Sequence, residues 1–357
     1  MSSAPHLPPK SCSIKWHERL RSLPWLLFFI LVSALVSGAT AILISSWIVP
    51  SILPSGQSVY MVGRTVDGEA IPDPRFQFMV EERIIEIYDT RKKVDDTFYP
   101  VTSHIASAMT LSSDGWAVAH IPSYTPGQEL HWEGVGQNGQ TLSIEQVTVN
   151  PIQELVYIKF SGTGRPFTLF AEWRSVSNGT GVWTISSTGQ WQTDMLLGPE
   201  KRSAESSLSL WVPHYAYRLI SSYPAGTLVI TEAGNFIGTV DTQGFVIDAF
   251  FTFEKRGNIF SGEAISYESL PVRGTLVDGF VGSEALNEVS GFLVESFETK
   301  ATSSLQVGDV IVRIQDERLQ DTWLWRQLLV APETVELTII RDGEMERVGV
   351  KKQNIAF

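Results

Sequence analysis

The chain has 357 residues, of which 43% are hydrophobic and 18% charged, a composition that predicts a folded protein of about two domains. Its net charge of −12 argues against binding nucleic acid, because phosphate recognition needs clustered Lys and Arg. The single cysteine, Cys12, excludes an internal disulfide, so we expect hydrophobic packing to hold the fold together.

The first predicted element is a membrane-spanning helix over residues 23–49. No residue in this range is charged, and it exceeds the roughly 20 residues that cross a bilayer. Basic residues precede it, and the first one after it is Arg64. This asymmetry predicts a cytoplasmic N-terminus over residues 1–22 and extracytoplasmic domains at the cell membrane. The alternative is a cleaved signal peptide, because Ala39-Thr40-Ala41 has the small-x-small form that a signal peptidase recognises.

Prolines and glycines punctuate residues 50–75, which we expect to form a linker. From residue 76 to residue 265, short runs rich in β-branched and aromatic residues alternate with turns. The clearest expected strands are residues 83–88, 105–111, 116–120, 142–149 and 155–160, and turns carry Gly115, Gly139, Gly179 and Gly234. Short strands with no long amphipathic helix between them predict a mostly β region, a sandwich or two small barrels.

Three segments of this region resemble the catalytic segments of HtrA-type serine proteases, which have a trypsin-like fold. They are ASAMTLSSDGWAVAH (106–120), PIQELVYIK (151–159) and SYPAGTLVI (222–230), the last followed by GNFIGTV (234–240). In that family the corresponding segments carry the catalytic histidine, the catalytic aspartate and the nucleophile. The resemblance implies a trypsin-like double β-barrel over residues 76–265.

The expected catalytic positions depart from the family pattern. Pro224 occupies the nucleophile position, and it has neither a hydroxyl nor a backbone N–H for an oxyanion. His120 comes two positions too early when the preceding turn is aligned, and Glu154 stands where the family has aspartate. Ser222 is the one nearby hydroxyl that could serve as nucleophile. The simpler interpretations are a surface or barrel-edge histidine and a turn serine.

Residues 268–350 resemble a bacterial PDZ domain, a small α+β fold. The segments that carry the resemblance are GFLVES (291–296), ATSSLQVGDVIVRI (301–314), DTWLWRQLL (321–329) and TVELTIIRDG (334–343). The residue pattern agrees, because Leu324, Leu328 and Leu329 form one apolar helical stripe and Asp342-Gly343 is a hairpin-turn signal. In the family, an extended peptide adds as a strand beside this helix, and backbone amides hold its C-terminal carboxylate.

The PDZ resemblance implies a peptide-binding set on one loop and on the helix. These residues are Arg273, Gly274, Thr275, Leu276, Trp323 and Leu324. Trp325 is a further candidate for the groove, with a core position as the alternative. The loop lacks the family's usual aromatic-leucine-glycine pattern, so the ligand class stays open.

Residues 351–357 form a C-terminal tail with two apolar side chains, Ile355 and Phe357, beside a free carboxylate. Such a tail could occupy the groove of a neighbouring copy and link a homo-oligomer, and a frayed end is the alternative.

Two functions remain open. The first is a membrane-anchored, inactive protease-like protein that binds peptide or protein ends in the cell envelope, and the second is an active serine endopeptidase of envelope quality control. Pro224 favours the first. No metal or other cofactor is expected, because His104, His131 and His214 have no ligand spacing to one another or to a cysteine.

Overall fold

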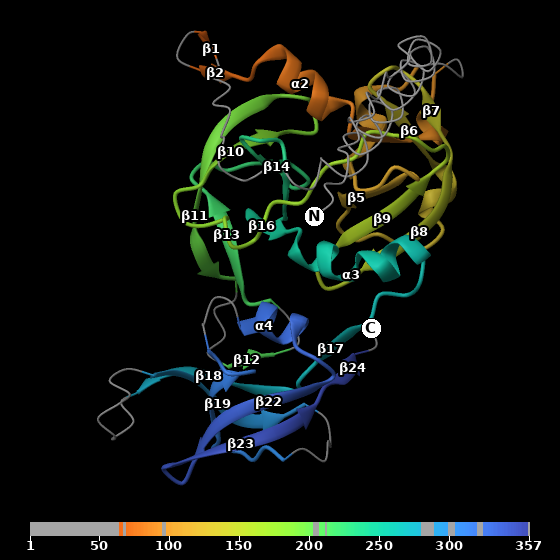
Figure 1. Ribbon diagram of the computed structural model, residues 1–357. Coiled ribbons are helices and arrows are strands. Elements are labelled where there is room, and N and C mark those ends of the chain that lie inside the picture. Colours follow the sequence, from red (N-terminus) through yellow and green to blue (C-terminus); the bar gives the residue numbers. More distant parts are fainter. Residues whose placement is uncertain are drawn as a thin grey trace, which may run out of the picture. The chain divides into compact units, whose positions relative to one another are not determined.

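The computed structural model describes residues 64–66, 69–94, 98–202, 207–210, 213–279, 289–298, 304–319 and 324–355 (Figure 1). The chain divides into two compact units, Met1–Val59 and Tyr60–Phe357, and every described residue belongs to the second. The expected membrane helix, residues 23–49, and most of the expected linker lie outside the described residues. Within the described ranges, no helix is long and apolar enough to cross a bilayer.

The first part of the described chain forms a seven-stranded antiparallel sheet in the order β7-β6-β3-β4-β5-β9-β8 (Figure 1). Its strands are β3 (Ile84–Asp89), β4 (His104–Thr110), β5 (Trp116–His120), β6 (Trp132–Gly136), β7 (Thr141–Leu142), β8 (Ile144–Asn150) and β9 (Leu155–Phe160). Four of the five expected strands lie within one residue of β3, β4, β5 and β9. The fifth is divided, because β7 pairs with β6 and β8 pairs with β9.

Short elements precede and connect these strands. They are the hairpin of β1 (Arg64–Val66) and β2 (Glu69–Ile71), the helix α2 (Pro74–Glu81), and the 3₁₀ turns η2 (Thr90–Lys92), η3 (Val101–Ser103) and η4 (Gln128–His131). Asp73 begins α2, because its side chain accepts a hydrogen bond from the Arg75 N–H at 2.8 Å. Phe76 and Val80, one helical turn apart, are buried and anchor α2.

The next part of the chain forms a closed barrel in the order β10-β11-β13-β16-β15-β14. Its strands are β10 (Gly181–Ile185), β11 (Trp191–Lys201), β13 (Tyr215–Leu219), β14 (Leu228–Thr231), β15 (Phe236–Val240) and β16 (Phe245–Asp248). The expected turn glycines Gly115, Gly139, Gly179 and Gly234 all have positive φ. At Gly115 no side chain would fit, because a Cβ atom would lie 2.3 Å from the Phe160 carbonyl oxygen.

The main core lies between the sheet and the barrel, and β5 shows how the sequence builds it. Trp116 and Val118 pack into this shared core, whereas Ala117 and Ala119 point into the separate core of the sheet. A strand buried on both faces reads as a continuous apolar run, as the sequence of β5 does. Because side chains alternate along a strand, His120 lies on the same face as Trp116 and Val118.

Helix α3 (Phe250–Ser261) follows the barrel and was not expected from the sequence. Phe250, Phe251 and Phe253 favour strands by intrinsic preference, which hides the helix in a single-sequence analysis. Burial decides the outcome instead, because Phe250, Phe251 and Ile259 are buried in the fold. Gly262, with φ of 71°, ends the helix.

The C-terminal part forms a sheet in the order β12-β18-β19-β20-β22-β23, with β21 paired to β20. Its elements are β12 (Leu208–Ser209), β18 (Val272–Gly279), β19 (Val289–Phe297), β20 (Val310–Ile314), β21 (Glu317–Arg318), α4 (Leu324–Val330), β22 (Thr334–Arg341) and β23 (Glu344–Lys351). The expected hairpin turn is present, with positive φ at both Asp342 and Gly343. Strand β12 comes from the connection between β11 and β13, far earlier in the sequence.

The C-terminal tail is neither free nor frayed up to Ile355. Residues Gln353–Ile355 form β24, which pairs antiparallel with β17 (Tyr267–Ser269). Ile355 lies opposite Tyr267 in this ladder, so this residue of the predicted tail ligand pairs within its own chain. Ala356 and Phe357 lie outside the described residues.

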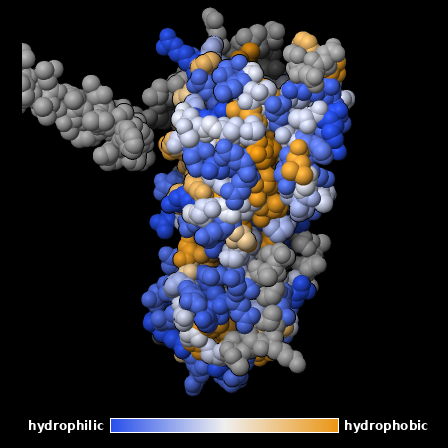
Figure 2. Space-filling model, turned by 90° about the vertical axis from the view of Figure 1, so that its right-hand side faces the viewer, coloured by the Kyte–Doolittle hydropathy of each residue, from blue (hydrophilic) through white to orange (hydrophobic). Residues whose placement is uncertain are grey.

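One face of the molecule carries a band of hydrophobic side chains with hydrophilic surface on either side (Figure 2). Among the described residues, Val101, Leu130 and Phe98 are the most exposed large apolar side chains. Contiguous apolar surface commonly marks contact with another molecule. Self-association stays a prediction that the fold does not test.

A buried ion pair joins helix α4 to the barrel. Arg326 Nη2 lies 2.7 Å from Asp248 Oδ2, and the Arg326 side chain is 9% exposed. The guanidinium also lies over the rings of Phe250, Tyr217 and Trp173, with centroid distances of 5.3, 5.9 and 5.9 Å. Removing one partner of a buried pair leaves the other charge without compensation.

We therefore expect Arg326→Ala to lower the free energy of unfolding of the full chain by about 3 kcal/mol, measured by urea denaturation. Arg347→Ala is the matched control. That side chain is 64% exposed and pairs with Glu336 at 3.0 Å, so its loss should cost less than about 1 kcal/mol. Equal effects of the two substitutions would contradict a structural role for the buried pair.

Candidate functional site

The expected catalytic histidine lies at the end of β5 in the core between the sheet and the barrel. Its side chain is 0% exposed, and its Nε2 atom lies 3.4 Å from Glu154 Oε2. No described residue makes a hydrogen bond of good geometry with either ring nitrogen. Glu154 precedes β9, the neighbour of β5, and has a positive φ of 54°. The structure therefore brings two of the expected triad residues together.

Burial sets the protonation of His120. Loss of hydration lowers the pKa of His120 below its ordinary value, because the imidazolium form is disfavoured in the core. The carboxylates of Glu154 and Asp241 oppose this effect, and the Arg202 guanidinium adds to it. The net result is a lowered pKa, so His120 is held in its neutral form, which is the form that a general base needs.

Asp241 and Arg202 were not singled out from the sequence. Arg202 Nη2 lies 2.5 Å from Asp241 Oδ2, and Asp241 is buried. The other carboxylate oxygen accepts hydrogen bonds from the Gln243 and Phe245 N–H groups at 2.8 and 2.9 Å. In the sequence Asp241 looks like an ordinary turn residue, and only the three-dimensional fold places the pair near His120.

The loop expected to carry the nucleophile lies between β13 and β14. Thr227 closes it, because its N–H and hydroxyl bond the Pro224 carbonyl oxygen at 3.2 and 2.8 Å. Gly226 has φ of 83°, and a Cβ atom built there would lie 3.8 Å from the His120 carbonyl oxygen. The loop is thus close to the main chain of His120.

Ser222 and Pro224 are both exposed in this loop. Within the described part of the chain, no hydrogen bond joins the Ser222 hydroxyl to His120 or to Glu154. Pro224 offers no hydroxyl and no N–H. The arrangement holds a neutral base beside a carboxylate but places no nucleophile within hydrogen-bond reach of it.

The expected peptide-binding loop lies at the start of β18. Arg273 is exposed and its Nε atom lies 3.5 Å from Glu298 Oε1, and the Thr275 hydroxyl donates to Glu295 Oε1 at 2.9 Å. Leu276 is half-buried against the C-terminal core. Gly274 admits no side chain, because a Cβ atom would lie 1.9 Å from the Leu293 carbonyl oxygen.

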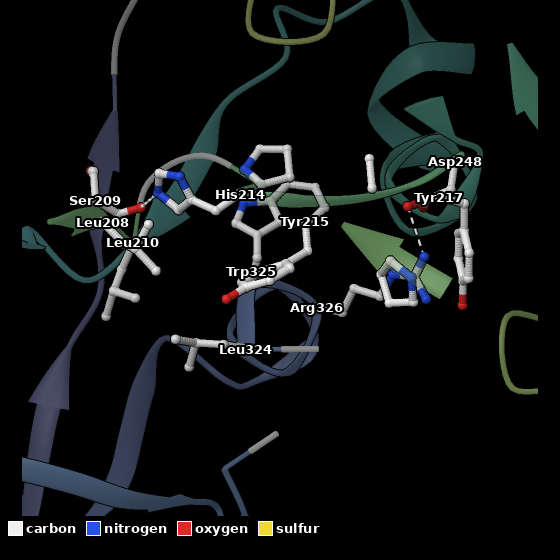
Figure 3. A pocket seen from close by; sticks show the side chains of 13 residues that line it. Leu208, Ser209, Leu210, His214, Tyr215, Tyr217, Asp248, Leu324, Trp325 and Arg326 are labelled. Carbon is white, nitrogen blue, oxygen red and sulfur yellow. Dashed lines mark hydrogen bonds and ion pairs between the residues drawn. The ribbon is translucent and has the colours of Figure 1, made fainter. Parts of the chain in front are cut away.

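Helix α4 divides its apolar residues between two surfaces, which corrects the expectation of one stripe. Leu324 and Leu328 are buried in the C-terminal core, beside β18. Leu329 and Trp325 instead pack against Phe251 and Tyr267, and the Trp325 ring lies 6.0 Å from that of Phe251. Trp325 also lines the space between α4 and residues 208–210 (Figure 3), so its part in a peptide-binding groove stays a prediction. Trp323 lies outside the described residues.

The outer edge of β18 is not free at its start, which the sequence did not indicate. Strand β12 pairs with it, opposite Gly274 and Arg273. Figure 3 shows Leu208, Ser209 and Leu210 of this segment beside helix α4, with His214 and Tyr215 closing the space between them.

The lowered pKa of His120 predicts a pH-dependent stability. An unfolded histidine titrates near pH 6.5, so below that pH unfolding takes up a proton that the folded protein does not yet bind. The free energy of unfolding should therefore fall as the pH falls below 6.5, by up to about 1.4 kcal/mol per pH unit. Denaturation of the full chain between pH 7.5 and 5 measures this slope. His120→Asn should flatten it, the exposed His131→Asn should not, and an unchanged slope in His120→Asn would contradict the assignment.

Comparison with known proteins gives one consistent result. No family model matches the sequence, and no curated protein matches it. Among solved structures, the HtrA-type protease AlgW with a decapeptide matches with a TM-score of 0.54 and 14% identity, covering 79% of this chain and 98% of that chain. AlgW with a tripeptide matches with a TM-score of 0.56 and 13% identity, covering 80% and 98%. The described chain is mostly β, its sheet and barrel match the trypsin-like barrels of these proteins, and its fold is that of an HtrA-type protease.

Proposed function

We propose that this chain is a membrane-anchored protein with the fold of an HtrA-type protease that does not hydrolyse peptide bonds and instead binds extended peptides through a C-terminal PDZ domain in the cell envelope. The observation that carries the proposal is Pro224, exposed in the loop beside His120 where a nucleophile is required. Acyl transfer needs a nucleophile and oxyanion donors, and a proline supplies neither.

The burial of His120 also supports the proposal that the chain does not hydrolyse peptide bonds. The His120 side chain is fully buried, so a substrate carbonyl cannot approach its ring nitrogens without movement of the surrounding core. Its 3.4 Å contact with Glu154 keeps two members of a triad without the third. A buried neutral histidine of this kind can persist as part of the packing after the nucleophile is lost.

Peptide binding is supported by the sheet edge that the C-terminal part presents. Strand β18 has β19 on one side and the short β12 on the other, and Leu324 and Leu328 of α4 share a core with Val272 of β18. PDZ domains take a peptide by strand addition between such a strand and a helix, and this likeness supports the proposal. The solved structures of similar fold contain a decapeptide and a tripeptide bound to AlgW.

We expect no covalent labelling when the purified full chain is treated with a fluorophosphonate probe, which reacts with activated serines. Pro224→Ser should not restore labelling, because the His120 ring would still be buried away from the loop surface. Trypsin treated in parallel confirms that the probe is active. Gel fluorescence reads the result.

Labelling of the wild-type chain that disappears in Ser222→Ala would contradict the proposal. That result would identify Ser222 as the nucleophile and favour the second candidate function, an active serine endopeptidase. The approach of His120 to Glu154 is the observation that keeps this candidate open.

The membrane anchor is proposed from the uncharged range 23–49 and the basic residues before it. Protease added to intact spheroplasts should digest residues 50–357 and leave the N-terminus protected, which antibodies against each end can report. Digestion only after lysis would reverse the topology. A mature chain that lacks residues 1–41 would instead identify a cleaved signal peptide.

A further inference from the structure

One segment of the chain belongs to two parts of the fold. Strand β12 lies in the connection between β11 and β13 of the barrel, yet it is hydrogen-bonded to the C-terminal sheet. Leu208 pairs antiparallel with Gly274, and the Leu210 N–H donates to the Val272 carbonyl at 3.1 Å. The segment therefore takes the outer edge of β18, where an added peptide strand would bind.

The apolar side chains of this segment fill the space beside α4. Leu208 and Leu210 are each 3% exposed, and both belong to the C-terminal core with Leu324 and Leu328. Residues two apart on a strand point to the same face, so both leucines reach the helix together. The cavity that remains between this segment, β13 and α4 is about 30 Å³, room for only a few water molecules (Figure 3).

Polar contacts hold the backbone of the segment in an extended form. The Ser269 hydroxyl donates to the Leu210 carbonyl at 2.6 Å, and His214 Nε2 donates to the Ser209 carbonyl at 2.5 Å. The Ser207 hydroxyl donates to Glu295 Oε2 at 2.8 Å. These bonds fix two backbone carbonyl groups and one side chain of the segment.

The pairing is also short. Strand β12 covers only Arg273 and Gly274, and among the described residues no strand pairs with the same side of residues 275–279. A longer extended peptide would make the same contacts and gain further backbone hydrogen bonds along β18. The free edge therefore gives a partner peptide an advantage over the internal segment.

We infer that residues 207–210 are an internal ligand of the β18 edge, and that partner peptides with apolar side chains two residues apart bind by displacing them. The inference rests on the proposed peptide-binding function and adds its ligand class and its regulation. Because the segment belongs to a barrel connection, whose base is closed by a hydrogen bond from the Arg202 N–H to the His214 carbonyl at 2.7 Å, peptide binding must also rearrange that connection.

The test compares three states of the full chain in detergent, all carrying Cys12→Ser. The probe is a fluorescein-labelled peptide with the sequence of residues 204–212, and its affinity is read by fluorescence anisotropy. The same peptide with serine in place of both leucines is the matched control. The states are the unmodified edge, an opened edge with Leu208→Ser and Leu210→Ser, and a locked edge with Ser209→Cys and Arg273→Cys.

The locked edge uses a favourable pair. Ser209 and Arg273 lie directly opposite each other in the antiparallel ladder, next to Leu210, whose N–H donates to the Val272 carbonyl. Opposite residues of an antiparallel pair have Cα atoms roughly 4.5 to 5.5 Å apart, within the range that a disulfide spans. Oxidation should fix the segment on β18, and reduction should release it.

We expect the opened edge to bind the probe at least about tenfold more tightly than the unmodified edge, because the probe no longer has to displace residues 207–210. The oxidised locked edge should bind at least about tenfold more weakly than its reduced form. Circular dichroism checks that each variant is folded. If the Leu208→Ser, Leu210→Ser variant is unfolded, the comparison of the oxidised and reduced locked edge tests the inference by itself.

Equal affinity in the unmodified, opened, oxidised and reduced forms would overturn the internal ligand while leaving peptide binding in place. Absence of binding in every form, the opened and reduced ones included, would overturn the proposed peptide-binding function and this inference with it.

Discussion

The apolar core between the seven-stranded sheet and the closed barrel is the constraint on which the rest of the structure depends. It is built from both halves, with Trp116 and Tyr157 from the sheet and Trp183 and Phe236 from the barrel all buried in it. This packing brings the end of β5 to the loop between β13 and β14. The position of His120 beside Gly226 is a consequence of that packing, since the two residues are more than 100 positions apart in the sequence.

The same constraint is compatible with the proposal that the chain does not hydrolyse peptide bonds. The core needs the strands and their apolar faces, but it does not need a hydroxyl at residue 224. The Pro224 carbonyl oxygen accepts hydrogen bonds from both the N–H and the hydroxyl of Thr227, and these bonds close the loop. His120 is retained as a buried neutral side chain, and the Arg202 and Asp241 pair nearby is satisfied by the turn that follows. Under the proposed function, this fold binds partners at the β18 edge instead of cutting them.

The sequence predicted local features well, because they depend on neighbouring residues. Short runs rich in β-branched and aromatic residues located β3, β4, β5 and β9, and glycines at 115, 139, 179 and 234 located turns that require positive φ. The sequence failed where tertiary packing decides. Helix α3 has the aromatic composition of a strand, Leu329 packs away from Leu324 and Leu328 of the expected stripe, and residues 353–355 of the tail pair with β17. The pairing of Leu208 with Gly274 joins residues 66 positions apart, and no local sequence pattern predicts it.

The central claim is that this chain binds extended peptides without cutting them. The most direct measurement is intact-mass spectrometry of the residue 204–212 peptide after prolonged incubation with the full chain, combined with recovery of the complex by size exclusion. The account predicts that the peptide co-elutes with the protein and is recovered at its full mass. Recovery of shorter fragments, absent when Ser222→Ala protein is used, would contradict it.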